Sequence, residues 1–292
     1  MQVKLRWFSI GQSDMNKTKK KSGIRGTLLL VLVLVAGLGL LLYPTFSDWW
    51  NSFHQSRAIA SYVQTVANLD KEDYERMLQE AQDYNRSLLT KTNRYNFTDE
   101  DKEEYNSILD VTGTGIMGYV EIPSIGVSLP VYHGTNEAVL QTAIGHIEGT
   151  SLPVGGIGTH CAVSGHRGLP SAKLFTDIDQ LKEGDTFLIQ VLDRTLTYEV
   201  DQIRIVLPTE LQDLEIDPQE DYCTLITCTP YGVNTHRLLV RGKRTANEVL
   251  EVSVTADAIQ IEPVLVAPLV AAPILLLLLI ILLLTTGKRK HR

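Results

Sequence analysis

The sequence predicts a mainly β fold, a barrel or closed sheet with short helices, held between two membrane-spanning helices. Between about residues 118 and 244, short apolar and β-branched runs alternate with turn residues, as in proteins built from many short strands. Two almost purely aliphatic runs, one near each end of the chain, approach the roughly 20 residues that cross a bilayer. The three cysteines are too few for a disulfide framework, and their odd number leaves at least one free thiol.

The two aliphatic runs are predicted to be membrane anchors at residues 27–46 and 263–286. Both have basic outer flanks, so the positive-inside rule places the tails, residues 1–26 and 287–292, in the cytoplasm. The chain between the anchors then lies outside the cell. A cleaved signal peptide is the alternative for the first run, but that run ends without a small-x-small cleavage site, which favours an uncleaved anchor.

The region between the anchors is strongly acidic. It holds 16 of the 27 Lys and Arg residues and 33 of the 34 Asp and Glu residues, which gives it a net charge of −17. Such a surface repels a phosphate backbone, so the composition argues against nucleic acid as a partner.

The remaining elements follow in chain order. Apolar residues at helical spacing predict one or two amphipathic helices over residues 58–89, within an extracellular helical segment at residues 47–115. The β domain is predicted to cover residues 116–245, and a linker at residues 246–262 leads to the second anchor. The predicted strands lie at residues 119–122, 127–132, 159–164, 186–191, 196–206, 222–227 and 236–240, and short helices at residues 136–141 and 173–181.

A thiol and a guanidinium are predicted to meet at the last two strands. Residues 222–227 are apolar and β-branched, and Cys228 stands where this strand ends. A turn with Pro230 and Gly232 follows, and Arg237 lies near the start of the next strand. A thiol that attacks a carbonyl needs one group to move protons and another to stabilise the oxyanion, and Arg237 can be the second. A buried structural thiol and a structural salt bridge are the alternatives.

The proton-transfer residue is sought among seven histidines. His166 follows the predicted strand at residues 159–164 and lies in the glycine turn Ser-Gly-His-Arg-Gly, which opens to the surface. His236 directly precedes Arg237 and therefore faces the other side of its strand. The other histidines lie near the membrane, in loops, in mid-strand or in the tail, at His54, His133, His146, His160 and His291. His166 is thus the candidate, with a surface loop histidine as the alternative.

These motifs carry a resemblance to a known family. The stretch ITCTPYGVNTHRLLVRGKR at residues 226–244, with SGHRGLPSAKLFTDI at residues 164–178, resembles the class C, pilus-assembling sortases. The resemblance spans about residues 118–244, and it includes the second anchor, since other sortase classes usually have one. It implies the eight-stranded sortase β-barrel, with Cys228 as nucleophile, His166 as proton donor and acceptor, and Arg237 as oxyanion stabiliser.

The resemblance also implies a reaction. Such an enzyme is a membrane-anchored cysteine transpeptidase that cuts an LPxTG-like sorting signal between Thr and Gly through a thioacyl-enzyme. The expected partners are pilin or surface proteins with that signal, and a pilin lysine as acyl acceptor; no metal or organic cofactor is expected. The alternatives are a housekeeping-type sortase that uses a peptidoglycan precursor, a non-catalytic membrane-tethered scaffold, and a secreted cysteine protease.

Two further features concern the surroundings of this site. Many class C sortases carry a lid pinned by an Asp-Pro-aromatic motif, which this chain lacks; Tyr95 and Phe97 stand at about that place and are the candidate lid residues, with a flexible open segment as the alternative. Cys161 and Cys223 each lie five residues before a candidate catalytic residue. On neighbouring strands they are expected to be packed thiols, with a disulfide, or a zinc site that also uses His166 and Cys228, as alternatives.

Overall fold

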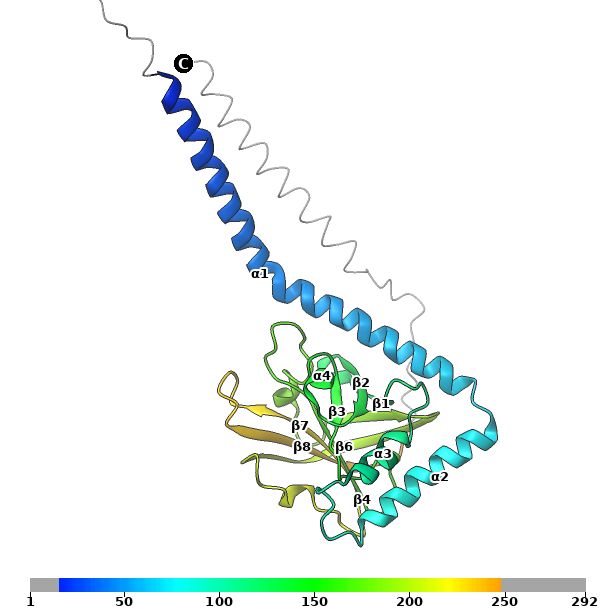
Figure 1. The fold of residues 1–292 in the computed structure, drawn as a ribbon. Coiled ribbons are helices and arrows are strands. Elements are labelled where there is room, and N and C mark those ends of the chain that lie inside the picture. The colour runs from blue at the N-terminus through cyan, green and yellow to red at the C-terminus, as the bar shows by residue number, and fades with distance from the viewer. Residues whose placement is uncertain (1–15, 248–292) are drawn as a thin grey trace, which may run out of the picture. The chain divides into compact units, whose positions relative to one another are not determined.

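The structure, a computed structural model, describes residues 16–247 and consists of three longer helices followed by a β domain (Figure 1). The predicted second anchor at residues 263–286 lies outside the described residues. The helices are α1 (Asn16–Ala67), α2 (Lys71–Leu88), α3 (Asp99–Ser107) and the single turn α4 (Glu137–Leu140). The strands are β1 (Ile116–Ile122), β2 (Val127–His133), β3 (Ile144–His146), β4 (Thr159–Ser164), β5 (Thr186–Val191), β6 (Arg194–Val206), β7 (Asp221–Thr229) and β8 (His236–Arg244).

The eight strands close into a barrel, which confirms the predicted mainly β fold. Their order around the barrel is β1-β2-β3-β4-β7-β8-β6-β5, and β5 pairs with β1 to close it. Most neighbours are antiparallel, but β2 with β3 and β4 with β7 are parallel. The parallel β4–β7 pair matters most for the site, because it brings the carboxyl ends of two strands far apart in sequence to the same edge.

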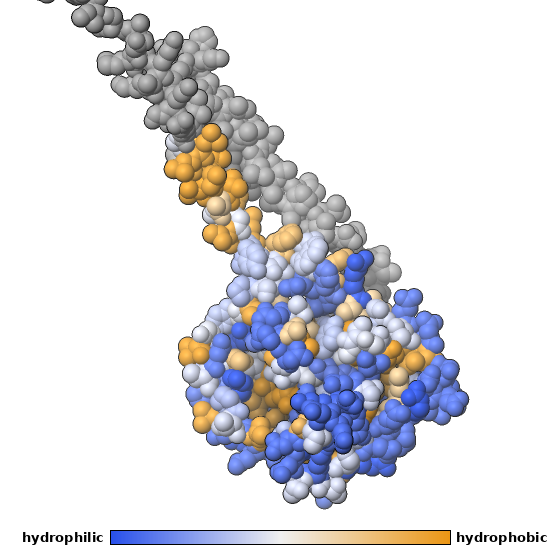
Figure 2. All heavy atoms as spheres, viewed as in Figure 1, coloured by the Kyte–Doolittle hydropathy of each residue, from blue (hydrophilic) through white to orange (hydrophobic). Residues whose placement is uncertain are grey.

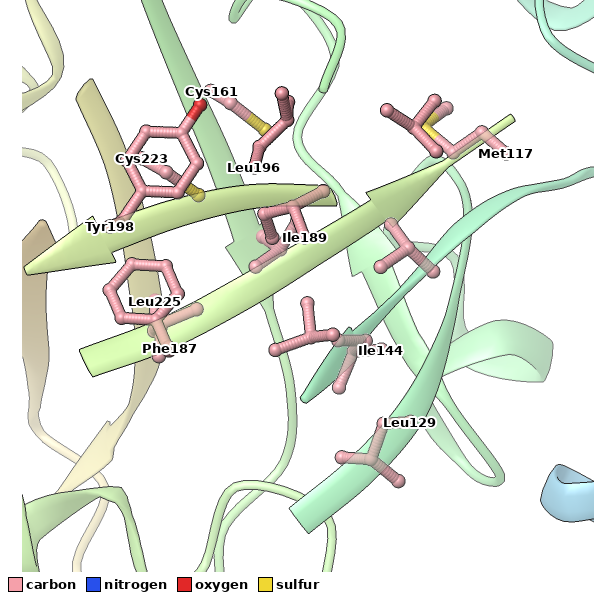
Figure 3. Packing of buried hydrophobic residues seen from close by; sticks show 14 of the residues in the cluster. Met117, Leu129, Ile144, Cys161, Phe187, Ile189, Leu196, Tyr198, Cys223 and Leu225 are labelled. Carbon is pink, nitrogen blue, oxygen red and sulfur yellow. The ribbon is translucent and has the colours of Figure 1, made fainter. Parts of the chain in front are cut away.

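Alternating side chains of these strands fill the barrel interior (Figure 3). Phe187 and Tyr198 stack with their ring centroids 5.6 Å apart, and Leu225 and Ile189 are fully or almost fully buried beside them. Each such side chain stabilises the fold by about 1.5–3 kcal/mol through removal of apolar surface from water. This core therefore holds β4, β7 and β8 in a fixed register.

Helix α1 joins the predicted anchor to the barrel without interruption. Many apolar side chains between Leu28 and Phe46 are exposed, and the helix from Val31 onward is long and apolar enough to cross a membrane (Figure 2). Its second half packs on the barrel through the buried Tyr62, whose hydroxyl donates to the Met117 carbonyl at 3.1 Å and accepts from the Leu192 amide at 2.7 Å. Figure 1 shows α1 bending along its length, and Pro44, which cannot complete the helical hydrogen bonds, lies inside it. Such an N-terminal helix fits a membrane anchor.

The structure corrects three local predictions. Strand β3 was not predicted, because its three residues contain Gly145 and form no β-branched run; pairing with β2 and β4 creates it. His133 and His146, expected in loops, are therefore the last residues of strands. The helix expected at residues 173–181 is only a 3₁₀ turn at Ile178–Gln180.

Candidate active site

Cys228 and Arg237 are direct partners in the antiparallel pair of β7 and β8. Alternate residues of a strand face opposite sides, so the buried clusters on each side tell where these two side chains point. Leu225 and Leu238 belong to the barrel interior, whereas Ile226 and Leu239 belong to a separate apolar cluster on the outer face. Cys228 and Arg237 are each two residues from a member of that outer cluster and point to the same side.

The outer apolar cluster forms the floor beside Cys228. Its members come from β4, β6, β7, β8 and the turn between β6 and β7, and they are Ala162, Val206, Leu214, Ile226 and Leu239. Val206 pairs directly with Arg237, so the cluster runs up to the thiol and the guanidinium. All five side chains are at most 6% exposed, so the cluster is a packed layer beneath this face.

His166 is brought next to Cys228 by the parallel pairing of β4 with β7. Ser164 pairs with Ile226, and beyond it the Gly165 amide donates to the Ile226 carbonyl at 3.0 Å. The Thr227 hydroxyl donates to the Gly165 carbonyl at 2.7 Å. These two hydrogen bonds hold the turn that carries His166 against the β7 residues that lead to Cys228.

The His166 imidazole is half-buried, and its Nε2 atom is buried without a hydrogen-bond partner among the described residues. Buried ring nitrogens are usually hydrogen-bonded, so a nitrogen without a partner is a candidate for proton transfer. The local sequence explains the position, because Gly165 leaves no room for a Cβ: one would lie 2.7 Å from Ile144 and 2.9 Å from the Phe175 ring. The glycine lets the turn approach the barrel closely.

The Arg237 guanidinium is available to a substrate, unlike that of Arg241. Its hydrogen bonds go to the backbone carbonyls of Asn234 at 3.3 Å and His236 at 3.1 Å, and it forms no ion pair within residues 16–247. Arg241, four residues on along the same strand face, donates twice to Asp201 at 2.7–3.0 Å and stacks over the Tyr222 ring. A guanidinium bound only by carbonyls can still meet a developing negative charge.

One residue near this site was not singled out by the sequence reasoning. Arg167, which directly follows His166, forms an ion pair with Asp179 and donates to the Thr229 hydroxyl at 3.3 Å. The only sequence signal was its place in the Ser-Gly-His-Arg-Gly stretch. An arginine in a turn gives no indication of its partners, because Asp179 and Thr229 come from other parts of the fold.

Neither candidate lid residue, Tyr95 or Phe97, has a hydrogen bond with Cys228 among the described residues. The Tyr95 hydroxyl accepts from the buried Arg94, which also donates to the carbonyl of Leu214, a member of the outer apolar cluster, at 2.9 Å. Phe97 packs edge-on against Tyr105, with their ring centroids 5.8 Å apart. Tyr105 is fully buried on the interior side of the barrel, whereas Cys228 faces outward. Figure 1 shows α3 well separated from the turn between β7 and β8.

We expect that replacing Tyr95 and Phe97 with alanine leaves the rate of Cys228 acylation unchanged within about twofold. The aromatic rings brace other parts of the fold, and removal of the Phe97 ring lowers the free energy of unfolding by about 2–4 kcal/mol. Acylation kinetics and thermal unfolding of the double variant check both effects. A clear rise in acylation rate would show that these residues do block the site.

Cys161 and Cys223 are register partners on β4 and β7, and both are free thiols buried in the barrel core (Figure 3). Burial raises the pKa of the Cys223 thiol well above its ordinary value, which keeps it protonated. Five strand residues, about 16 Å, separate each of them from the His166 and Cys228 positions. The four residues of the alternative zinc site are therefore not gathered at one point, and residues 16–247 contain no group of three or more His, Cys, Asp or Glu side chains that could hold a metal ion.

His160, also on β4, titrates far from the site and makes folding depend on pH. Its Nδ1–H donates to the Glu215 carbonyl at 2.9 Å, and its Nε2 accepts from the Thr224 hydroxyl at 2.7 Å. Burial, aided by the charges of Arg241 and Arg94, lowers the pKa of His160 to about 4. The folded protein therefore holds this imidazole neutral at a pH where the unfolded chain binds a proton.

Stability is expected to fall as the pH decreases from about 6.5 to about 4. Over that window the unfolded state gains the His160 proton first, and the loss reaches on the order of 3 kcal/mol. His160→Gln should reduce this pH dependence, measured as the difference between variant and parent in unfolding at pH 7 and pH 4.5. An identical pH dependence in both proteins would contradict the assignment to His160.

The three groups at this strand edge are of the kinds that acyl transfer needs. The Cys228 thiol and the Arg237 guanidinium belong to register partners, and the turn that holds the His166 imidazole is hydrogen-bonded to β7 at Thr227. Together they supply attack, proton transfer and oxyanion stabilisation, which is the set of functions that a cysteine acyltransferase needs.

Comparisons with known proteins agree with this chemistry. Residues 120–245 match the sortase domain. The crystal structure of sortase C1 from Streptococcus agalactiae is 53% identical and covers 66% of this chain and 100% of that chain, with a TM-score of 0.64. A Clostridium perfringens sortase C, solved with the C-terminal cell wall sorting motif, is 42% identical and covers 65% and 99% of the two chains, with a TM-score of 0.58. Sortase A of Bacillus anthracis is 26% identical over 74% of this chain and 92% of that protein.

Proposed function

This chain belongs to the sortase family of cysteine transpeptidases, with class C enzymes among its structural relatives, and from that premise we propose that it polymerises pilins. In this proposal it cleaves an LPxTG-like sorting signal between Thr and Gly and transfers the threonine acyl group to a pilin lysine. The observation that carries the proposal is the outward-facing pair of Cys228 and Arg237, with the His166 turn beside it.

In the first half-reaction, Cys228 is the nucleophile. Its sulfur, as thiolate, attacks the threonine carbonyl carbon, and the oxyanion that forms is stabilised by Arg237. The C–N bond to glycine then breaks. The protonated His166 gives its proton to the leaving amine, and a thioester between the threonine acyl group and Cys228 remains.

In the second half-reaction, an amine takes the place of the leaving group. The lysine nitrogen attacks the thioester carbonyl and loses a proton to His166, while Arg237 again stabilises the oxyanion. The C–S bond breaks, the Cys228 thiolate is restored, and an isopeptide bond joins two pilin subunits. His166 ends in its starting protonation state, so the cycle needs no external reductant or cofactor.

The donor is proposed to be a peptide sorting signal. A sorting motif in the Clostridium perfringens sortase C structure supports the same class of donor by analogy. The acceptor amine is proposed on the strength of the class C relatives.

The proposed location is the outer face of the cell membrane. The aliphatic run of α1 at residues 27–46 serves as the anchor, and the basic residues before this run favour a cytoplasmic N-terminus. The second anchor at residues 263–286, with its basic tail, is proposed to return the chain to the cytoplasm. Substrates that are themselves membrane-bound would then meet the barrel near the bilayer.

The test uses the full-length protein in detergent with an LPxTG-type peptide and a lysine-bearing pilin domain. Mass spectrometry is expected to show a threonine acyl adduct on Cys228 and an isopeptide-linked product. An adduct that passes only to water would favour a protease, and one that passes only to a glycine amine would favour the housekeeping-type reaction. The absence of any adduct with a range of sorting peptides would favour the non-catalytic scaffold.

A further inference from the structure

The Arg167 side chain crosses from the turn after β4 to the end of β7. It is only 11% exposed, and it contacts three separate segments. Its guanidinium forms an ion pair with Asp179 of the 3₁₀ turn, donates to the Thr229 hydroxyl at 3.3 Å and lies 5.9 Å from the centre of the Tyr231 ring. None of these contacts is with Cys228 or Arg237.

Two side-chain hydrogen bonds (ties) join the turn after β4 to the end of β7, one on either side of His166 in the sequence. The Thr227 hydroxyl binds the Gly165 carbonyl, and Arg167 binds the Thr229 hydroxyl. One hydrogen bond joins Gly165 to Thr227 and the other joins Arg167 to Thr229, so His166 and Cys228 lie between the two bonds in the sequence. Strand β4 ends at Ser164. Beyond the Gly165 amide, these two side-chain hydrogen bonds connect the turn to β7 in place of strand pairing.

The turn is closely packed around this tie. Gly168 has a φ of +73°, and a Cβ at that position would lie 2.7 Å from the Tyr231 ring. Tyr231, from the turn between β7 and β8, therefore rests directly on the glycine. The guanidinium is held between this ring and the Asp179 carboxylate, so its direction toward Thr229 is set from two sides.

We propose that Arg167 is a positioning residue that holds the His166 turn against the Cys228 end of β7. The proposal rests on the proposed roles of His166 and Cys228, since it concerns their spacing. Arg167 donates no proton and touches no reacting atom. Without it the turn keeps only the Thr227 tie, and a shift of about 1 Å in the imidazole is enough to cost about 100-fold in rate.

The test compares Arg167→Met, Arg167→Lys and Thr229→Val in the full-length protein with a sorting peptide and an amine acceptor. Arg167→Met is expected to lower kcat by about 10–100-fold with KM changed less than about threefold. Arg167→Lys should recover part of kcat, because an ammonium can still bridge Asp179 and Thr229. Thr229→Val should lower kcat by itself and add little to Arg167→Met, because the two changes break one tie.

A second readout separates positioning from loss of folding. The rate of Cys228 alkylation by iodoacetamide should fall severalfold in Arg167→Met, in the same direction as in His166→Ala, with the melting temperature within a few degrees of the parent. Arg86→Met, which breaks an exposed ion pair on α2, is the matched control and should change neither rate.

Three outcomes would overturn the proposal. They are a kcat loss that merely follows the fraction of unfolded protein, a rise in KM at unchanged kcat, and unchanged kinetics in Arg167→Met. If the parent protein forms no acyl adduct but the alkylation rate still falls in Arg167→Met and Thr229→Val, the proposed function fails while the positioning role of Arg167 stands.

Discussion

Replacing Cys228 with alanine is expected to abolish both the acyl adduct and the transpeptidation product. The proposed reaction passes through a thioester on this sulfur, so no slower route remains once the nucleophile is gone. We expect turnover to fall by at least about 10⁴-fold, to the level of the uncatalysed reaction with bound peptide. The measurement is adduct mass spectrometry together with steady-state transpeptidation by the full-length protein.

The other two cysteines provide the matched control. Cys161 and Cys223 are 3% and 0% exposed in the barrel core, so neither can reach a peptide on the outer face. Cys223→Ala should keep an adduct-forming Cys228, with a loss of stability of about 1–2 kcal/mol from the small cavity. Residual transpeptidation in Cys228→Ala at more than about 1% of the parent rate would mean that another group is the nucleophile.

Replacing Arg237 with alanine is expected to lower kcat by about 10²–10³-fold, or about 2.7–4 kcal/mol of transition-state stabilisation. The guanidinium faces the outer side beside Cys228 and is bound only by backbone carbonyls, so it is free to meet the oxyanion. Its charge matters most where charge develops, so the loss should appear in kcat more than in KM. Steady-state kinetics and the rate of adduct formation measure the two half-reactions separately.

Arg241→Ala is the control for charge and strand position. Arg241 lies on the same face of β8, but both its hydrogen bonds to Asp201 and its contact with Tyr222 hold it away from the site. Its removal should reduce stability by about 1–3 kcal/mol and leave kcat within about threefold. Equal losses of kcat in the two variants would argue that Arg237 acts through the general positive charge of β8 and not at the oxyanion.

Much of the fold could be predicted because its strands follow from local sequence patterns, that is, short apolar runs bounded by turn residues. The strands at residues 159–164 and 186–191 have the predicted bounds, since each is a short apolar run closed by turn residues. Strand β3 could not be found, because three residues around a glycine carry no period of two; they form a strand only through pairing with β2 and β4. The short helix at residues 173–181 was overpredicted, since helical spacing alone does not guarantee helical hydrogen bonds.

The candidate site divides in the same way. The sequence by itself determined the residue types, a cysteine at one strand end, an arginine at the start of the next strand, and a histidine in a glycine turn, because turn chemistry and strand alternation are local. Length and composition also sufficed to show that the first aliphatic run can form a helix long and apolar enough to cross a membrane.

Only the tertiary structure decided which of these residues meet. The register of β4 with β7 is set by packing of the barrel core, and that register places His166 beside Cys228 across 62 residues of chain. The same packing gave Tyr95 and Phe97 their contacts with Arg94 and Tyr105, and Arg167 its partners Asp179 and Thr229. Contacts between distant segments depend on the whole set of buried side chains, and no window of sequence contains that set.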